Sequence, residues 1–359
     1  MNNRVYNFYA GPGALPLPVL ERAHAELFNF QNLGMSVMEL SHRTPQMQMI
    51  IDDSAERIKQ QMGLGDAFEV IFLQGGGSLQ FIMIPLNLSR PGEAIDYIDT
   101  GHWTQRAIEE AERLPRDVAV IATTADSDHN HLPADLPYRP EAKYVHICTN
   151  NTTTGTQWRS LPKIGVPYVA DMSSDFLARV LDVAPFDLIY AHAQKNIGLS
   201  GVTAVIIRKS LLADIPDDLP KLLDYRTHID KRSNYHTPAC FSMYITWLML
   251  QWLEDEIGGV AAMAAINEQK AKLLYDYIDN SSFYRCPVPE EYRSVMNVVF
   301  HLETAALEGE FVVAAEKAGF VGVGAHRTRT GCRVSLYNAV TVEAVEALIA
   351  FMYQFEKGK

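Results

Sequence analysis

A glycine-rich turn and a tryptophan stand where two short apolar runs of this sequence end. The turn Gln74–Ser78 follows the run 68–73 and precedes a predicted helix, so its bare backbone N–H groups could bind a phosphate. Trp103 follows the run 94–99 and could stack on a flat ring. In isolation, such a turn is more often a simple strand-to-helix connection, and such a tryptophan a packing residue. No GK[ST] or GxGxxG pattern is present there, which argues against a nucleotide or dinucleotide site.

Asp171 and Lys195 follow two further apolar runs. Asp171 ends the run 167–171, and Lys195 comes after the run 187–191 among small and neutral residues. Alone, such an acid is commonly a helix N-cap, and such a lysine reaches out to solvent. Together with the glycine turn, which can bind a phosphate, and Trp103, which can stack on a ring, however, they match the needs of pyridoxal 5′-phosphate. Its pyridine nitrogen requires a carboxylate and its aldehyde requires an amine. We therefore predict a pyridoxal phosphate site in which Lys195 and Asp171 are catalytic.

The elements that must position these groups are predicted by alternating β-rich and helical patterns between about residues 67 and 208. Such alternation is typical of an α/β fold with a mostly parallel sheet sandwiched by helices, in which ligands bind at the carboxyl ends of the strands. A long amphipathic pattern at 260–278, followed by strand and helix patterns, predicts a smaller α+β C-terminal domain. We expect a large cofactor-binding domain over 16–256 and a small domain over 257–359. We expect the N-terminal segment 1–15 to join the small domain.

Composition restricts the partners. The chain has 359 residues and a net charge of −12, so its overall field repels nucleic acid and anionic membranes, and an anionic ligand would need a local basic cluster. Four widely spaced cysteines without a CxxC pair predict reduced, buried thiols in a cytoplasmic protein. We expect no metal, since His129 and His131 lie in a proline-rich loop region. No secretion signal or apolar run of the ~18 residues that span a membrane is apparent.

Several motifs are similar to those of one enzyme family. The sequence resembles the phosphoserine aminotransferases, which belong to the class V aminotransferases and have the type I fold of pyridoxal-phosphate-dependent transferases. The resemblance covers nearly the whole chain and is carried by Asn7-Phe8, Ala10–Gly13, Ser36–Glu39, Ser41–Arg43, Gly101–Trp103, Ala193–Gly198 and Ser335–Ala339.

The resemblance implies a role for each matching cofactor residue. Lys195 would form the Schiff base and shuttle the proton, Asp171 would pair with the pyridine nitrogen, and Trp103 would stack on the ring. The other cofactor-binding residues would be Gly77, Ser78, Thr152, Gln194, His236 and Thr237. In the family, the pair matching His236-Thr237 comes from the neighbouring subunit, so a homodimer is expected.

The resemblance also implies how substrate is bound. O-phosphoserine and glutamate each carry two anionic groups, and arginine side chains suit both carboxylate and phosphate. Arg333 would clamp the α-carboxylate. The distal phosphate or γ-carboxylate would be bound by His42, Arg43, His326 and Arg327.

Several positions depart from the commonest family pattern. Ser78 stands where some members carry arginine, His236 where asparagine is usual, and Leu199 where proline is common. Arg329-Thr330 replace smaller residues and add a charge near the substrate site, although a solvated surface arginine is an alternative interpretation.

The implied reaction is transamination between glutamate and 3-phosphohydroxypyruvate, which gives O-phosphoserine in L-serine biosynthesis. Many bacterial members also transaminate a phosphorylated hydroxythreonine in vitamin B6 biosynthesis. Alternatives are cysteine desulfuration, for which Cys332 is the only candidate thiol near an active-site motif, and transamination of glyoxylate by alanine or serine. An alternative of another class is a non-catalytic α/β protein that binds a phosphate or nucleotide at the glycine turn.

Overall fold

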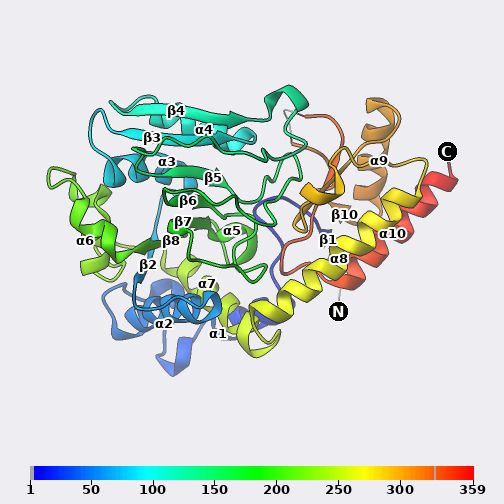
Figure 1. Ribbon diagram of the computed structural model, residues 1–359. Coiled ribbons are helices and arrows are strands. Elements are labelled where there is room, and N and C mark those ends of the chain that lie inside the picture. The colour runs from blue at the N-terminus through cyan, green and yellow to red at the C-terminus, as the bar shows by residue number, and fades with distance from the viewer. Residues whose placement is uncertain (1–3, 327–328) are drawn as a thin grey trace.

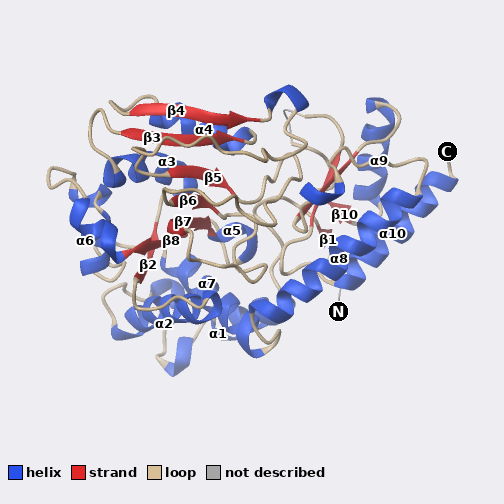
Figure 2. Cartoon of the chain, viewed as in Figure 1, coloured by secondary structure: helices blue, strands red, loops and turns tan. Residues whose placement is uncertain are grey.

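A seven-stranded sheet forms the centre of the molecule (Figures 1 and 2). The computed structural model describes residues 4–326 and 329–359. The strand order is β2-β8-β7-β6-β5-β3-β4. The bounds are β2 (Phe68–Leu73), β3 (Ala94–Asp99), β4 (Asp117–Thr123), β5 (Val145–Cys148), β6 (Tyr168–Asp171), β7 (Phe186–His192) and β8 (Thr203–Arg208). All neighbouring pairs are parallel except those made by β8, so the predicted mostly parallel sheet is confirmed.

The reversed strand β8 determines which strand ends meet. It is antiparallel to both β2 and β7, and Thr203 pairs with Leu73 on one side and His192 on the other. Consequently β2 and β7 run in the same direction, and the carboxyl ends of β2, β3, β5, β6 and β7 lie along one edge of the sheet. The segments that carry the predicted chemistry all leave the sheet at this edge.

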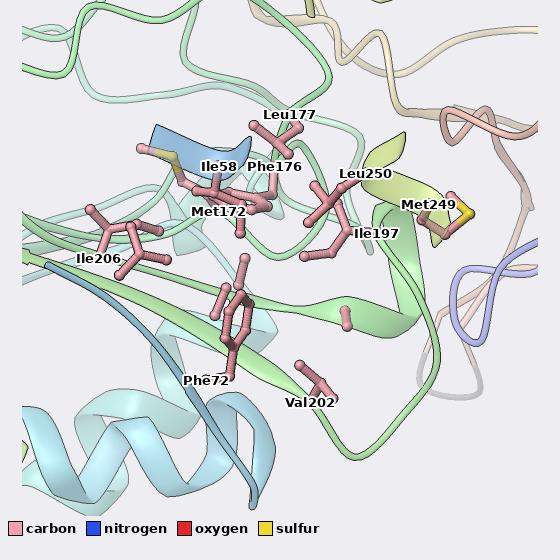
Figure 3. Close-up of a cluster of buried hydrophobic side chains, with 14 of the residues drawn as sticks. Ile58, Phe72, Met172, Phe176, Leu177, Ile197, Val202, Ile206, Met249 and Leu250 are labelled. Atoms are coloured by element: carbon pink, nitrogen blue, oxygen red, sulfur yellow. The ribbon is translucent and has the colours of Figure 1, made fainter. Parts of the chain in front are cut away.

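Helices cover both faces of the sheet because successive strand residues point to opposite sides. On one face, side chains such as Phe72 and Ile206 pack against α1 (Leu17–Glu26), α2 (Pro45–Met62) and α7 (Cys240–Asp255). Figure 3 shows part of this cluster, with Ile58 from α2 and Leu250 from α7. On the other face, β-strand side chains pack against α3 (Gly76–Leu88) and α4 (His102–Ala111). The short helices α5 (Ala193–Asn196) and α6 (Tyr225–Asp230) follow β7 and β8 in the chain.

A separate group of elements is built from the two ends of the chain. The antiparallel pair β9 (Asn297–Phe300) and β11 (Cys332–Ser335) packs with α8 (Val260–Asn280), α9 (Ala305–Lys317) and α10 (Val342–Lys357). The N-terminal strand β1 (Tyr6–Asn7) pairs in parallel with β10 (Phe320–Val321). The remaining elements are the 3-10 helices η1 (Phe30–Asn32), η2 (Val37–Glu39), η3 (Ala125–Ser127), η4 (Lys209–Asp214), η5 (Lys221–Leu223) and η6 (Glu290–Tyr292).

Two hydrophobic cores support the division that the sequence predicts. Phe8 belongs to the same core as β9, β11 and α10, whereas Val19 belongs to the core on the large sheet. Helix α8 contributes to both, with Met263 in the core on the large sheet and Leu274 in the core that contains Phe8. We propose a large domain over 16–256 and a small domain formed by 257–359 with the segment 1–15.

Hydrogen bonds at the helix starts show why the helices begin where they do. Thr44, Thr304 and Thr341 each accept a hydrogen bond from the backbone N–H three residues later, at the starts of α2, α9 and α10. Helix α2 ends at Gly63, whose φ of 63° lies in the left-handed region that favours glycine. These local signals in the sequence set the start of one helix on the large sheet, α2, and of two helices that pack with β9 and β11.

The thiols differ in part from expectation. All four cysteines are free, and Cys148 and Cys332 are buried, but Cys240 and Cys286 are only half-buried because each lies at the edge of its core. In the described ranges, no group of three or more histidine, cysteine or acidic side chains is arranged to hold a metal ion. Among the helices of residues 4–326 and 329–359, none is long and apolar enough to cross a membrane.

Candidate active site

Lys195 meets Thr152 and Trp103 at the sheet edge. It lies in the single turn of α5, directly after β7. Its Nζ donates a hydrogen bond of 2.8 Å to Thr152 Oγ1 and lies 5.8 Å from the centre of the Trp103 ring. Thr152 follows β5 and Trp103 opens α4 after β3, so three separate strand ends bring these side chains together. The lysine is therefore held by a neutral hydroxyl beside an aromatic face.

Asp171 is the last residue of β6, the strand next to β7. Its side chain is 7% exposed, and its Oδ1 accepts a hydrogen bond of 2.8 Å from the backbone N–H of Ser173. In the sheet register Asp171 pairs with Tyr190, whose hydroxyl interacts with the carboxylate. Burial, together with the Asp171 charge, raises the pKa of Tyr190. The phenol is therefore neutral and can donate a hydrogen bond to the acid.

The glycine turn packs its backbone against His192. Gly75 and Gly76 have φ angles of 85° and 69°, and a Cβ on Gly76 would lie only 2.0 Å from His192 Cε1. A Cβ on Gly77 would approach the same ring to 3.2 Å. This close packing places the N-terminus of α3, with its unpaired backbone N–H groups, at the sheet edge. Gly77 is buried here and Ser78 is exposed.

His192 also orients Gln194, since its Nδ1 lies 2.7 Å from Gln194 Oε1. Burial lowers the pKa of His192, so the ring is neutral at pH 7. Sequence reasoning missed this histidine. Its position, ending an apolar strand two residues before Gln194, was the available signal.

The N-terminal segment covers the backbone of Lys195. Gly13 donates its N–H to the carbonyl of Gln194 (2.8 Å), and a Cβ at Gly13 would lie 2.9 Å from both the Lys195 carbonyl oxygen and Tyr337 Cδ2. Tyr337 in turn donates its hydroxyl proton to the Ala10 carbonyl (2.7 Å). Only glycine allows this approach, which explains the physical need for the Ala10–Gly13 motif.

Arg333 brings an uncompensated positive charge to the site from β11. Its side chain is mostly buried, and its Nη1 lies 3.5 Å from the Thr152 carbonyl oxygen, a long contact. Its Nε is buried without a hydrogen-bond partner, and no acidic side chain of residues 4–326 and 329–359 forms a salt bridge with it. Burial lowers the pKa of Arg333. A buried guanidinium in this state requires an anion from outside the protein.

The predicted residues His42, Arg43, His236 and Thr237 form a second group. Asn234 Nδ2 donates to the His42 carbonyl (2.8 Å), and the His236 ring lies 6.0 Å from that of His228. Arg43 is exposed. This group adjoins the glycine turn through Gln74, whose Nε2 donates to the Thr237 carbonyl (2.7 Å). The structure thus groups His42 and Arg43 with 234–237 and shows no contact between them and Lys195.

His326 lies near the start of α4, with its ring 5.1 Å from that of His102, the residue before Trp103. Arg327 lies outside the described residues. A polar cavity of about 580 Å³ is lined by His102, Gln105, Asp128, His129, His301, Arg329 and Thr330. Arg329 Nη1 forms a salt bridge of 3.0 Å with Asp128 Oδ2 across it. The charge that the sequence adds at position 329 is therefore partly neutralised.

The chain belongs to the class-V aminotransferase family, whose model matches residues 5–348. Among the proteins it resembles, a phosphoserine aminotransferase of Geobacillus kaustophilus (strain HTA426) is 50% identical over 357 residues, which are 99% of each chain. One of Desulfatibacillum aliphaticivorans is 47% identical over 358 residues, again 99% of each. The family expectation from the sequence is confirmed.

Solved structures agree with this result. The structure of a phosphoserine aminotransferase from Bacillus circulans subsp. alkalophilus superposes with a TM-score of 0.96 at 43% identity, covering 99% of both chains. A pyridoxal-phosphate-bound phosphoserine aminotransferase from Trichomonas vaginalis has a TM-score of 0.90 at 35% identity and covers 98% of this chain and 100% of its own. The predicted type I fold is confirmed.

Proposed function

We propose that this chain transfers the amino group reversibly between glutamate and 3-phosphohydroxypyruvate, producing 2-oxoglutarate and O-phosphoserine for L-serine biosynthesis, with pyridoxal 5′-phosphate as cofactor. The observation that supports an amino acid as the substrate is the buried guanidinium of Arg333. It has no acidic partner among the residues that the structure describes, and it contacts Thr152, which accepts the hydrogen bond of Lys195. An amino acid supplies an α-carboxylate for this charge.

The residues at the sheet edge fit pyridoxal phosphate. The start of α3 offers backbone N–H groups to a phosphate, Trp103 offers a ring face, and Asp171 offers a buried carboxylate. When bound, the cofactor supplies an electron sink for the bond broken at Cα of the substrate. We propose that Gly77, Ser78, Thr152 and Gln194 complete its binding site.

Lys195 is placed to attach the cofactor and to move a proton. Its amine is hydrogen-bonded to a hydroxyl and has no carboxylate within salt-bridge distance in the described ranges, so no ion pair must be broken before it reacts. The neutral partner Thr152 keeps Nζ directed into the site. The same amine can take the proton from Cα of a bound amino acid and return it, as a general base and acid.

Cysteine desulfuration is disfavoured by the state of the thiols. Such an enzyme needs a reactive thiolate. Burial raises the pKa of all four cysteines, including Cys332, which lies in β11 next to Arg333. Cys332 is therefore protonated and held in a strand, and so is Cys148, which lies in β5.

A spectrum tests the cofactor assignment, and half-reactions test the substrate. Reconstituted protein should absorb visible light, and glutamate or O-phosphoserine should change the spectrum faster than alanine or cysteine. Lys195→Ala should lose turnover by several orders of magnitude, because both attachment and proton transfer require the amine, while Lys231→Ala at an exposed position should not. A colourless reconstituted protein would support the non-catalytic alternative, and a faster response to alanine or cysteine would support another class V activity.

We further propose a cytoplasmic homodimer in which the second group of residues serves the partner's site. Arg43 is exposed, and apolar side chains are exposed close to it in the sequence, including Met35 (41%) and Met38 (58%). Exposed apolar side chains of this kind are typical of an interface. We propose that His42, Arg43, His236 and Thr237 bind an anionic group across this interface, whereas His326 and Arg327 act within their own chain.

Subunit complementation tests this arrangement. Lys195→Ala and Arg43→Ala chains, each inactive alone, are mixed, unfolded and refolded together. If Arg43 serves the partner, half the dimers are mixed and each has one intact site, so about a quarter of wild-type activity returns. If Arg43 serves its own chain, no intact site forms and activity does not return.

A further inference from the structure

A buried chain of hydrogen-bonding groups lies behind Asp171. The Tyr190 hydroxyl interacts with the Asp171 carboxylate and lies 2.9 Å from Nε2 of His146. Three adjacent strands, β5, β6 and β7, supply these residues. Tyr190 and His146 are 0% and 2% exposed, so water does not compete for these bonds.

The direction of the hydrogen bonds follows from what each group can donate. An ionised carboxylate only accepts, so the single proton of the Tyr190 hydroxyl points to Asp171. The Tyr190 oxygen can then accept, and Nε2 of His146 must be the donor. This leaves Nδ1 of His146 without a proton.

The surroundings of His146 agree with this tautomer. Its Nδ1 is buried with no hydrogen-bond partner. Leaving an unprotonated nitrogen unpaired costs less free energy than leaving an N–H group unpaired. The Tyr97 ring stacks on the imidazole at 5.0 Å between ring centres. Burial lowers the pKa of His146 to about 4, so the ring is neutral at pH 7.

We infer that His146 and Tyr190 are positioning residues that hold Asp171 as an oriented anion through a fixed Nε2–H···O–H···carboxylate chain. Asp171 is the residue proposed to face the pyridine nitrogen, so this inference rests on the proposed cofactor. Neither residue touches the cofactor in this role. Each acts through the carboxylate, which keeps one orientation because its inner side is already bonded.

The first test observes the tautomer directly. In protein labelled with ¹⁵N-histidine, His146 is assigned by loss of its signal in the His146→Gln variant. We expect a neutral ring protonated at Nε2 in both cofactor-free and loaded protein between pH 6 and 8. A ring protonated at Nδ1, or at both nitrogens, would overturn the inference.

The second test measures the affinity for pyridoxal phosphate. Tyr190→Phe should weaken binding by about tenfold or more, since it removes a hydrogen bond to a charged group. Tyr144→Phe is the matched control, because it removes another buried hydroxyl, bonded to Tyr97 rather than to Asp171. Equal effects of the two variants would refute the role of Tyr190.

Variants at position 146 separate positioning from packing. His146→Gln keeps an N–H donor at the same distance along the side chain and should bind the cofactor nearly as tightly as the wild type, whereas His146→Leu should weaken binding. In a Tyr190→Phe background, His146→Leu should add no further loss, because the histidine acts through the hydroxyl. An additive loss would contradict the chain. Failure of the wild type to bind pyridoxal phosphate would instead refute the proposed function.

Discussion

Arg333 carries its charge inside the protein, and none of the carboxylates that the structure describes pairs with it, so the site must bind an anion. The planar guanidinium can bind a carboxylate through two parallel hydrogen bonds, which a lysine ammonium cannot reproduce. Both proposed amino-acid substrates offer the same α-carboxylate. A substitution that weakens carboxylate binding at Arg333 should therefore slow the reaction with both substrates.

Arg333→Lys should lower kcat/KM about a hundredfold for glutamate and for phosphoserine alike, as expected for the loss of a bidentate charged contact. Stopped-flow half-reactions with each amino acid measure the effect. The exposed Lys231→Arg exchange serves as a control. A loss confined to phosphoserine would show that Arg333 binds the distal phosphate instead.

His146 should make the fold sensitive to acid. Its pKa is about 4 in the folded protein, against an ordinary value of 6.5, so between these values the unfolded chain binds a proton that the folded chain does not. The free energy of unfolding should therefore fall as pH falls through this window, by up to about 3 kcal/mol from this residue.

The measurement compares wild type with His146→Gln in urea unfolding at pH 7, 5.5 and 4.5. The wild type should lose stability relative to the variant as pH falls. His24→Gln, at an exposed position of α1, is the control substitution. A wild-type minus His146→Gln difference that stays constant would contradict the prediction.

At the scale of elements, α8 holds a loop of the site through one lysine. Lys270 is fully buried and donates hydrogen bonds of 2.9–3.0 Å to the carbonyls of Leu336, Tyr337 and Val340. The same loop touches α5, since the Asn338 N–H donates to Asn196 Oδ1. The helix thereby anchors the segment that packs beside Lys195.

Lys270→Met should destabilise the protein by about 3 kcal/mol or more, because three buried carbonyls each lose a charge-assisted hydrogen bond, and only that of Tyr337 is known to keep another, from the Val340 N–H. The midpoint temperature of thermal unfolding and the fraction of cofactor retained should both decrease. Lys272→Met is the matched control, two residues along the same helix, where the side chain is exposed and paired with Asp276. Similar effects at the two positions would argue against the anchoring role.

The sequence predicts most elements but not every contact. Runs such as 68–73 and 94–99 form strands as predicted, because apolar β-rich patterns are local. The reversal of β8 could not be predicted, since an apolar run reads the same in either direction. His146 and Tyr190 were missed because each lies inside an apolar strand, where the sequence alone does not distinguish a hydrogen-bonding side chain from one that only packs in the core. Lys270 was missed because a lysine on an amphipathic helix normally faces water.

At the scale of the whole molecule, the Arg329–Asp128 salt bridge joins the segment before β11 to the loop after η3, beside the polar cavity. Asp128 is largely exposed, so the bridge itself adds little stability. Its greater effect is on charge near the path of an anionic substrate. In a protein of net charge −12, each local charge of this kind alters the rate of encounter.

Asp128→Asn should raise kcat/KM for phosphoserine severalfold at low salt, and the gain should shrink as salt screens the field. Arg329→Gln should lower it. Asp126→Asn changes the net charge equally, at an exposed position with no salt bridge in the described ranges, and should have a smaller effect. Identical behaviour of the two aspartate variants would show that only net charge matters.

The pairing of β1 with β10 also has a consequence for biosynthesis. Residues 6–7 emerge from the ribosome early but find their partner strand only when residues 320–321 have been translated. Until then Phe8, whose N–H bonds to the Val321 carbonyl, and Arg333 lack their native surroundings. Completion of the pocket is thus among the last events of chain synthesis, and a truncated product that ends before residue 320 would lack Arg333 and the Tyr337 hydroxyl that bonds to Ala10.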